Sequence, residues 1–417
     1  MTTQHPLRAF PNLRYYLMSR LTATLAQNAM VVVIGWQVYD IARRTMDTKN
    51  AAFQLGLVGV AQFLPLLLLT LFAGWTADRL DRRWIVRVAL ALQLGCALAL
   101  ALLNLHGLIS LPALFTVAMM LGVSRAFAMP ALQALAPNLV PQAVLPRAIA
   151  LSSIAWQVGA ILGPAAGGYL YAAGLSLPYL VATGLFAISL IGLMLIGPVP
   201  RSSIASTANP WRQMVEGLSY VRNNRLVLGA ISLDLFAVLL GGATAMLPIY
   251  ARDILKVGPE GLGHLRAAPA IGAAATALWL SIKPLKHNVG PKMLSGVAVF
   301  GVATIVFGLS RSMPLSLACL TLLGIGDMIS VFVRQSLIQI YTPDAMRGRV
   351  GAVSSLFISG SNELGEAESG FLAALIGPVA AVVGGGVGAV VVTVLWNRWF
   401  PEIRNARTFD PPARLDQ

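Results

Sequence analysis

Twelve long apolar segments dominate this amino-acid sequence and limit the folds it can adopt. An α-helix needs about 20 mostly apolar residues to cross the hydrocarbon core of a bilayer, and each segment is about that long. Only 11% of the 417 residues are charged, against about 25% in soluble domains. This composition excludes a secreted disulfide scaffold, a disordered chain and an ordinary cytosolic enzyme. The predicted spans are residues 15–38, 53–77, 84–104, 111–132, 147–172, 177–198, 226–250, 262–282, 292–310, 314–339, 349–376 and 379–399.

The basic residues indicate how these spans are oriented. The chain carries 30 Lys and Arg against 16 Asp and Glu, a formal net charge of +14. With both termini in the cytoplasm, about 20 basic residues fall on the inner side and about seven on the outer side, as the positive-inside rule requires. We therefore predict a multi-pass membrane protein with both termini on the cytoplasmic side (N-in/C-in). The same bias explains the net charge without a nucleic-acid partner, and no basic stripe mixed with aromatic residues lies outside the spans.

The longest polar interval falls between the sixth and seventh spans and divides the chain into two halves. We predict a six-helix bundle over residues 1–198, a cytoplasmic linker over 199–225, a second six-helix bundle over 226–400 and a cytoplasmic tail over 401–417. Within the linker, Trp211 to Val221 are predicted to form a short amphipathic helix on the inner membrane surface. The fold class is therefore all-α, with two six-helix bundles related by pseudo-symmetry.

An internal repeat supports this division. When the sequence is shifted by 202 residues, 121–170 lies without gaps on 323–372, with 15 identities in 50 positions. Matched pairs include Arg147 on Arg349 and Gly168 on Gly370. Chance similarity between apolar sequences is the alternative, but it does not account for matched arginines, prolines and serines. Two six-helix halves in parallel repeat are typical of one large class of secondary transporters.

The loop between the second and third spans carries a charged motif, Gly74-Trp75-Thr76-Ala77-Asp78-Arg79-Leu80-Asp81-Arg82-Arg83. It resembles the loop signature G-x-x-x-D-R-x-G-R-R of the major facilitator superfamily, where the charge cluster helps to hold the outward-open state. Asp81 stands where that signature has glycine, so the geometry of the turn is open. The alternative is a generic positive-inside loop. The resemblance implies a gating role for Gly74, Asp78, Arg79, Arg82 and Arg83.

The fifth span contains a glycine-rich run, Gly159-Ala160-Ile161-Leu162-Gly163-Pro164-Ala165-Ala166-Gly167-Gly168. Glycines at this spacing give a flat face for close helix packing, and an internal proline removes a backbone donor and allows a bend. The run resembles a motif of the exporter and antiporter branches of the superfamily. Packing alone is the alternative to a moving interface. The resemblance implies conformational gating at Gly159, Gly163, Pro164, Gly167 and Gly168.

Nearly the whole chain resembles bacterial major facilitator exporters of the enterobactin-exporter type. Besides the two motifs, the resemblance includes Trp36-Gln37-Val38-Tyr39 at the end of the first span and Arg347-Gly348-Arg349 before the eleventh. The second-half counterpart of the loop motif, 283–287, keeps positive charge but lacks the aspartate. The resemblance implies the major facilitator fold and an export function.

Three glutamates lie near the middle of the eleventh span, where a charged side chain is costly and is a functional candidate by default. Glu363 and Glu366 share a helical face with Ser359 and Gly370, whereas Glu368 points away from Glu363 by roughly 140°. Three ionised acids in one span would repel one another, so at least one is expected to carry a proton near neutral pH. This is the chemistry of a proton-coupled antiporter.

Other roles for these acids remain open. They include hydrogen bonding between helices, ion pairing with Arg334 or Arg125, and lining the transport path without taking up protons. Asp234 in the seventh span and Asp327 in the tenth are further proton-coupling candidates. Asp327 and Arg334 are seven residues apart and share one helical face, but they reach each other only in extended conformations, so each is expected to have another partner.

Several polar or aromatic residues inside the spans are candidates for the substrate path. Arg125 resembles the span-four arginine of proton antiporters, although the surrounding motif is poorly kept, and structural pairing is the alternative. Trp156 has helix packing as its alternative. The full set of path candidates is Gln27, Asn28, Arg125, Trp156, Gln157, Arg334 and Asn362.

The leading hypothesis is a secondary active transporter with its site between the halves, exporting an amphipathic small molecule such as a siderophore or drug by proton antiport. No Walker A pattern is present. The four histidines lie at span ends or in loops, and the two cysteines have no metal-ligand spacing, so we expect no metal. We also expect no cofactor, with the proton gradient as energy source, and a monomer whose partners are the bilayer and its substrate.

Three alternatives remain. The first is an uptake symporter or a lysolipid or metabolite translocator on the same fold. The second is a non-transporting membrane sensor or scaffold, which would normally need a signalling domain. The third is a membrane enzyme, which would need a nucleophile with its base, or metal ligands, inside the spans. No such set appears in the sequence, so we predict that the protein is not an enzyme.

Overall fold

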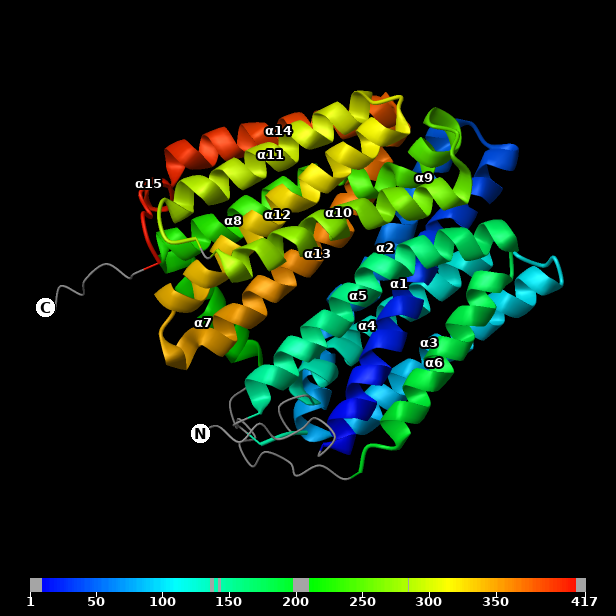
Figure 1. Cartoon of the computed structure of the whole chain (residues 1–417), viewed down its shortest axis with the longest axis horizontal. Coiled ribbons are helices and arrows are strands. Elements are labelled where there is room, and N and C mark those ends of the chain that lie inside the picture. The colour runs from blue at the N-terminus through cyan, green and yellow to red at the C-terminus, as the bar shows by residue number, and fades with distance from the viewer. Residues whose placement is uncertain (1–9, 136–138, 142–143, 198–209, 284, 410–417) are drawn as a thin grey trace, which may run out of the picture. The chain divides into compact units, whose positions relative to one another are not determined.

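A computed structural model of the chain describes residues 10–135, 139–141, 144–197, 210–283 and 285–409 (Figure 1). Every regular element in these residues is helical. The first half contributes six long helices that coincide closely with the predicted spans. They are α1 (Pro11–Thr45), α2 (Thr48–Arg79), α3 (Arg82–Leu105), α4 (Leu111–Leu135), α5 (Leu145–Ala173) and α6 (Leu177–Met194).

The second half contributes five further long helices and one broken span. The continuous helices are α10 (Gly258–Ile282), α11 (Val289–Leu309), α12 (Met313–Tyr341), α13 (Asp344–Ile376) and α14 (Pro378–Trp399), followed by the short α15 (Pro401–Arg404). The linker helix is α7 (Pro210–Asn223). The predicted linker residues before it, 199–209, lie outside the described residues.

The predicted span over 226–250 is present as Arg225–Ile254, but it is interrupted and is not one continuous helix. Helix α8 (Arg225–Leu240) ends at Gly241 and Gly242, and the span continues through η3 (Ala243–Met246), α9 (Leu247–Ile249) and the π-helix η4 (Tyr250–Ile254). Two consecutive glycines weaken a helix by about 1 kcal/mol each relative to alanine. Hydropathy does not reveal such a break, because every residue around it is apolar.

Eleven helical segments in the described part of the chain are long and apolar enough to cross a membrane, counting Arg225–Ile254 as one. The predicted eleventh span is not among them, although it forms the single 33-residue helix α13. The physical reason is its composition, because this helix carries the three glutamates that the sequence marks as functional candidates. The membrane-embedded, all-helical character of the chain is clear, whereas the count of twelve spans and the N-in/C-in orientation stay predictions.

The chain divides into two compact units. Unit 1 contains residues 1–45, 60–207 and 257–267, and unit 2 contains residues 46–59, 208–256 and 268–417. In unit 1, α1 packs against α5 and α6, and α3 packs against α4 and α6. In unit 2, α11 packs against α12 and α14, and α13 packs against α7, α8 and α14. The start of α2 therefore packs within unit 2, and the start of α10 packs within unit 1.

Helix α7 is anchored in unit 2 by an ion pair and a hydrophobic cluster. Glu216 Oε2 lies 2.8 Å from Arg349 Nη1 of α13, and the Tyr220 hydroxyl donates to the carbonyl of Tyr341 at 2.7 Å. Val221 is buried in a cluster with apolar residues of α8, α12 and α13. The predicted amphipathic helix is thus present: Met214, Tyr220 and Val221 pack against other helices of the same unit, whereas Val215 and Leu218 are exposed. Its position on the inner membrane surface stays a prediction.

Candidate functional site

A buried ion pair joins two helices of unit 2. The guanidinium of Arg334 in α12 contacts the carboxylate of Asp234 in α8. Arg334 is 2% exposed and Asp234 is 6% exposed. Charges this deep need a partner, because desolvation of an isolated ion costs several kcal/mol. Asp234 is thus the additional partner expected for Arg334, and the Nε of that arginine has no hydrogen-bond partner in the described part of the chain.

The three glutamates of α13 have different surroundings. Glu363 is buried, whereas Glu366 and Glu368 are half-buried. The Cβ of Glu366 lies next to Gly59 of α2, 3.4 Å from the position that an added Cβ would occupy there. Glu368 accepts a 3.4 Å hydrogen bond from the hydroxyl of Ser369. Glu366 and Glu368 therefore have different neighbours: Glu366 lies next to the start of α2, and Glu368 bonds to Ser369 of its own helix. Ser359 has no described side chain.

The remaining polar candidates are dispersed. In unit 1, Arg125 Nη1 donates to Gln62 Oε1 of α2 at 3.5 Å. Asn28 donates to the carbonyl of Thr24 within its own helix at 2.8 Å, and Gln27 is half-buried. Arg20, a neighbour of these residues on α1, donates to the carbonyl of Ser152 at 3.2 Å.

Trp156 and Gln157 lie on α5, with Trp156 50% exposed and Gln157 half-buried. In unit 2, Asp327 is half-buried, and Asn362 is exposed and donates to the carbonyl of Ile358 in its own helix at 2.9 Å. Asp234 and Arg334 are thus two predicted residues that the described structure brings into direct contact.

The glycine run of α5 packs directly on α1. An added Cβ at Gly159 would lie 2.8 Å from the side chain of Thr24, and one at Gly163 would lie 2.8 Å from the carbonyl oxygen of Leu25. At Gly167 it would lie 2.8 Å from the carbonyl oxygen of Ala29. Only glycine allows the two backbones to approach this closely. The close-packed face predicted from the spacing is therefore present, and whether it moves during transport stays a prediction.

The repeat-matched glycines Gly168 and Gly370 make equivalent crossings, each inside one unit. In unit 1, an added Cβ at Gly168 of α5 would lie 3.1 Å from the Cα of Gly263 at the start of α10. In unit 2, an added Cβ at Gly56 near the start of α2 would lie 3.2 Å from the Cα of Gly370 in α13. The repeat-matched glycines thus each take part in one close helix crossing, one in each unit.

The loop motif is described only in part. Helix α2 runs through Gly74, Asp78 and Arg79, but the side chains of these residues lie outside the described part of the structure. Asp81 is the N-cap of α3, and its carboxylate accepts from the backbone amide of Arg83 at 3.0 Å. The departure from glycine therefore supplies a cap of the type that helix N-termini prefer.

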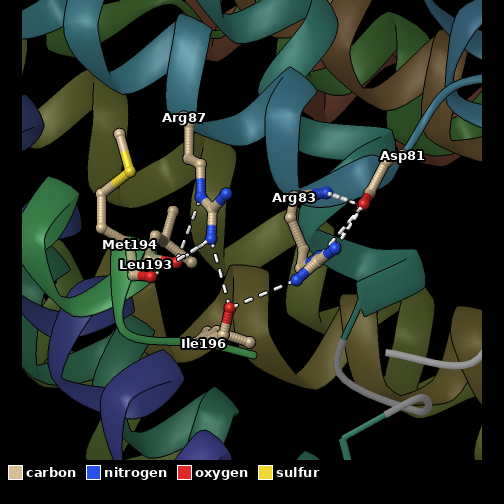
Figure 2. A network of polar contacts seen from close by, with 6 residues as sticks. All are labelled: Asp81, Arg83, Arg87, Leu193, Met194 and Ile196. Atoms are coloured by element: carbon tan, nitrogen blue, oxygen red, sulfur yellow. Dashed lines mark hydrogen bonds and ion pairs between the residues drawn. The ribbon is translucent and has the colours of Figure 1, made fainter. Parts of the chain in front are cut away.

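The same carboxylate accepts from the guanidinium of Arg83, with Nη2 to Oδ2 at 2.6 Å (Figure 2). This hydrogen bond is the main reason that the pKa of Asp81 is lowered from its usual value, so the carboxylate is ionised at neutral pH. Arg83 Nη1 also donates to the carbonyl of Ile196 at 3.3 Å. The first turn of α3 is thereby linked to the segment that follows α6.

Arg87 is a further member of this network that the sequence motif does not include. Its Nη2 donates to the carbonyls of Leu193 at 2.9 Å, Met194 at 3.3 Å and Ile196 at 3.2 Å (Figure 2). The last carbonyls of a helix lack intrahelical donors, and cations are favoured at this end of the helix dipole. Arg87 therefore caps the C-terminus of α6. A basic residue one turn into a membrane helix is the sequence signal that could have indicated this role.

We predict that Arg87→Gln lowers the free energy of unfolding by about 1–3 kcal/mol, because charge-assisted hydrogen bonds to carbonyls near buried backbone are lost. Thermal unfolding of the purified protein in detergent measures the effect. Arg14→Gln is the matched control, since Arg14 is exposed at the start of α1. Equal unfolding midpoints for the two variants would contradict the capping role.

No group of three or more His, Cys, Asp or Glu side chains within the described ranges is arranged to hold a metal ion. The acids described above are distributed over α8, α12 and α13 instead. A carboxylate in an apolar environment is stabilised by taking up a proton or by pairing with a cation.

Comparison with known proteins places these features in a family. Residues 10–412 match the family described as transmembrane secretion effector. This chain belongs to that family of the major facilitator superfamily. It is 27% identical to the enterobactin exporter EntS of Escherichia coli O1:K1 / APEC over 414 residues, which cover 97% of this chain and 95% of the exporter.

Solved transporters share the fold. A bacterial homologue of the human lysosomal transporter Spinster, in an inward-facing and occupied conformation, aligns with a TM-score of 0.73 and 15% identity, over 96% of this chain and 99% of that one. A D-xylose-proton symporter aligns with a TM-score of 0.69 and 14% identity, over 93% and 98% of the two chains. The family match over residues 10–412 confirms the predicted superfamily membership. The chain is a multi-pass transporter, and its relatives are transporters rather than enzymes.

Proposed function

We propose that this transporter is a proton-coupled exporter of an amphipathic small molecule, with siderophores and drug-like compounds as the substrate classes to test. Its place is the bacterial inner membrane, and it works as a monomer by alternating access between its two halves. The proton gradient supplies the energy, with no cofactor and no nucleic-acid partner. Full-length similarity to an enterobactin exporter supports export as the direction of transport and a siderophore as one substrate class to test.

The observation that carries proton coupling is the buried Asp234–Arg334 ion pair. A carboxylate whose charge is neutralised only by one arginine has two alternative states, ion-paired or protonated. Protonation of Asp234 would break its ion pair with Arg334, and release of the proton would restore the pair, so the pair can alternate between these two states during the cycle.

Unit 2 also contains the other acidic candidates. Glu363, Glu366 and Glu368 on α13 and Asp327 on α12 lie in the same compact unit as the ion pair. In the proposed cycle a carboxylate releases its proton toward the cytoplasm and substrate binds. Reprotonation from outside then resets the transporter. Glu366 and Glu363 remain the main candidates for this proton transfer, since both lie on the predicted common face of α13.

The second candidate function is substrate uptake by symport, or translocation of a lysolipid or metabolite. The shared fold with a D-xylose-proton symporter is compatible with it, but similarity at 14% identity concerns the fold alone. A non-transporting sensor or scaffold is the third. Proton release from the purified protein on addition of substrate is expected for antiport, and for neither of these two alternatives.

We predict that Glu363→Gln/Glu366→Gln reduces proton-gradient-driven transport in everted vesicles by at least about tenfold, the change expected when a proton-transfer group is removed. Siderophores and cationic drugs are screened with and without the gradient. Gln keeps the size of each side chain but cannot release a proton. The matched control is Glu260→Gln, because Glu260 is an exposed acid at the start of α10 and lies outside the predicted spans.

Undiminished pH-coupled transport by the double variant would exclude these two glutamates as the coupling groups. Loss of gradient-driven transport together with retained substrate binding would support the proposal.

A further inference from the structure

Unit 2 contains a cavity of about 750 Å³ that is separate from the proposed transport site. It is lined by the junction of α7 and α8, the last residue of α12 and the chain segment after α15. No predicted proton-coupling or substrate-path residue lines it. Its volume lies within the range of about 300–1,000 Å³ that is usual for small-molecule sites. The predicted N-in/C-in orientation places it at the cytoplasmic side.

One wall of the cavity holds a fixed arginine. Arg225 Nε donates to Glu402 Oε1 at 2.7 Å, and its Nη2 donates to the carbonyl of Trp399 at 2.9 Å. The guanidinium also lies 5.8 Å from the ring centroid of Phe400. These contacts use two of the five N–H donors of the guanidinium. Arg225 is therefore held in place with donors remaining for a ligand, and its side chain is 62% exposed.

A second arginine, Arg407, comes from the C-terminal segment. Arg407 Nη1 donates to Asn288 Oδ1 at 2.9 Å, and the backbone amide of Asn288 donates to the carbonyl of Arg407 at 2.6 Å. The amide of Gly290 donates to the carbonyl of Ala406 at 3.0 Å. The C-terminal segment is thus tied to the start of α11, so Arg407 is held beside the cavity that it lines.

The start of α8 adds a partial positive charge. Asn224 caps this 16-residue helix by accepting from the amide of Val227 at 3.1 Å. Arg225 and Leu226 occupy the first two helical positions, where amides have no intrahelical acceptor, and both residues line the cavity. Amides and dipole at a helix N-terminus favour phosphate and other anions. Against two arginines the lining residues include one acid, Glu402, so the cavity is positive overall.

We propose that this cavity binds a phosphate group, carried by an anionic phospholipid headgroup or by a soluble phosphate ester. Arg225 and Arg407 supply charge-assisted hydrogen bonds from two sides, as arginines do in phosphate sites. The helix amides of α8 complete the recognition. The bound anion would join the start of α8 to the C-terminal segment. This site is additional to the proposed transport function and does not depend on it.

The test is thermal unfolding of the purified full chain in neutral detergent, titrated with inorganic phosphate against sodium chloride of equal ionic strength. A second arm compares the protein in phosphatidylcholine vesicles with and without phosphatidylglycerol. We expect a saturable rise of the unfolding midpoint in at least one arm. A response to free phosphate indicates a soluble ester, and a response to phosphatidylglycerol alone indicates the lipid headgroup; both outcomes support an anion site.

Three variants assign the response to the cavity. Arg225→Gln and Arg407→Gln should each raise the half-saturating anion concentration by at least about tenfold, because a charged donor is lost. Glu402→Gln should lower it, because a negative charge is removed from the wall. Arg404→Gln is the matched control, since Arg404 is exposed on α15 and does not line the cavity.

The proposal is overturned if the wild-type chain responds to neither anion source, or if Arg407→Gln and Arg404→Gln respond alike. A Glu402→Gln variant that binds more weakly than wild type would also count against it. Transport driven by a proton gradient in phosphatidylcholine vesicles is measured on the same preparations. Failure of the anion site then remains distinguishable from failure of the transport function.

Discussion

Asp234→Asn should destabilise the protein by about 3–5 kcal/mol, the cost of leaving a buried charge without its partner. The charge concerned is that of Arg334, whose side chain is 3% exposed in the ion pair. Thermal unfolding in detergent measures the stability, and everted vesicles measure transport. We expect gradient-driven transport to fall by at least about tenfold, because a proton-coupling candidate has been removed.

The double variant Asp234→Asn/Arg334→Gln separates stability from coupling. It removes both charges and keeps hydrogen-bonding side chains, so it should recover most of the lost stability, as neutral replacements of buried pairs often do. If the pair takes part in coupling, transport stays low in this stable double variant. If both stability and gradient-driven transport recover in the double variant, the ion pair has a structural role only.

Gly167→Leu should strongly impair folding and transport. An added Cβ would lie 2.8 Å from the carbonyl oxygen of Ala29 and 3.0 Å from its Cα. These are backbone atoms of α1, so no rotation of a flexible side chain relieves the contact. Overpacking of a well-packed core typically costs about 1–3 kcal/mol, and leucine adds three further carbons. The yield of folded protein, its unfolding midpoint and the transport rate measure the result.

Gly95→Leu in α3 is the matched control for this substitution. Gly95 has no heavy atom within 4 Å of an added Cβ in the described structure. The same change in side-chain size should therefore have little effect there. Equal losses in the two variants would attribute the effect to the loss of glycine itself and not to the α1–α5 crossing.

The sequence predicted the positions of most helices closely, because a span needs only length and apolarity. Helix α3 covers Arg82–Leu105 against a predicted 84–104, and α14 covers Pro378–Trp399 against 379–399. The sequence also predicted the glycine face of α5, because glycines at this spacing allow close packing against another helix. The break after α8 was missed, because hydropathy is insensitive to consecutive glycines among apolar residues.

The partners of the charged residues were less predictable. Single-chain periodicity placed Asp327 and Arg334 on one face of α12, but Arg334 pairs with Asp234 of another helix. Arg87 lies near the start of the predicted third span and outside the loop motif. Its role as the cap of α6 depends on the carbonyls of Leu193, Met194 and Ile196.

By itself, the sequence determined that this chain is an all-helical multi-pass membrane protein with an internal repeat, and its motifs resemble those of a transporter superfamily. Backbone polar groups without hydrogen bonds are costly in lipid, so apolar segments of this length span a bilayer as helices. Only the tertiary structure decided which ions pair, which glycines allow helices to cross, and where a charged cavity forms between α8 and the C-terminal segment. These features depend on contacts between residues far apart in the sequence, and helical periodicity fixes the face of a residue but not the helix that it meets.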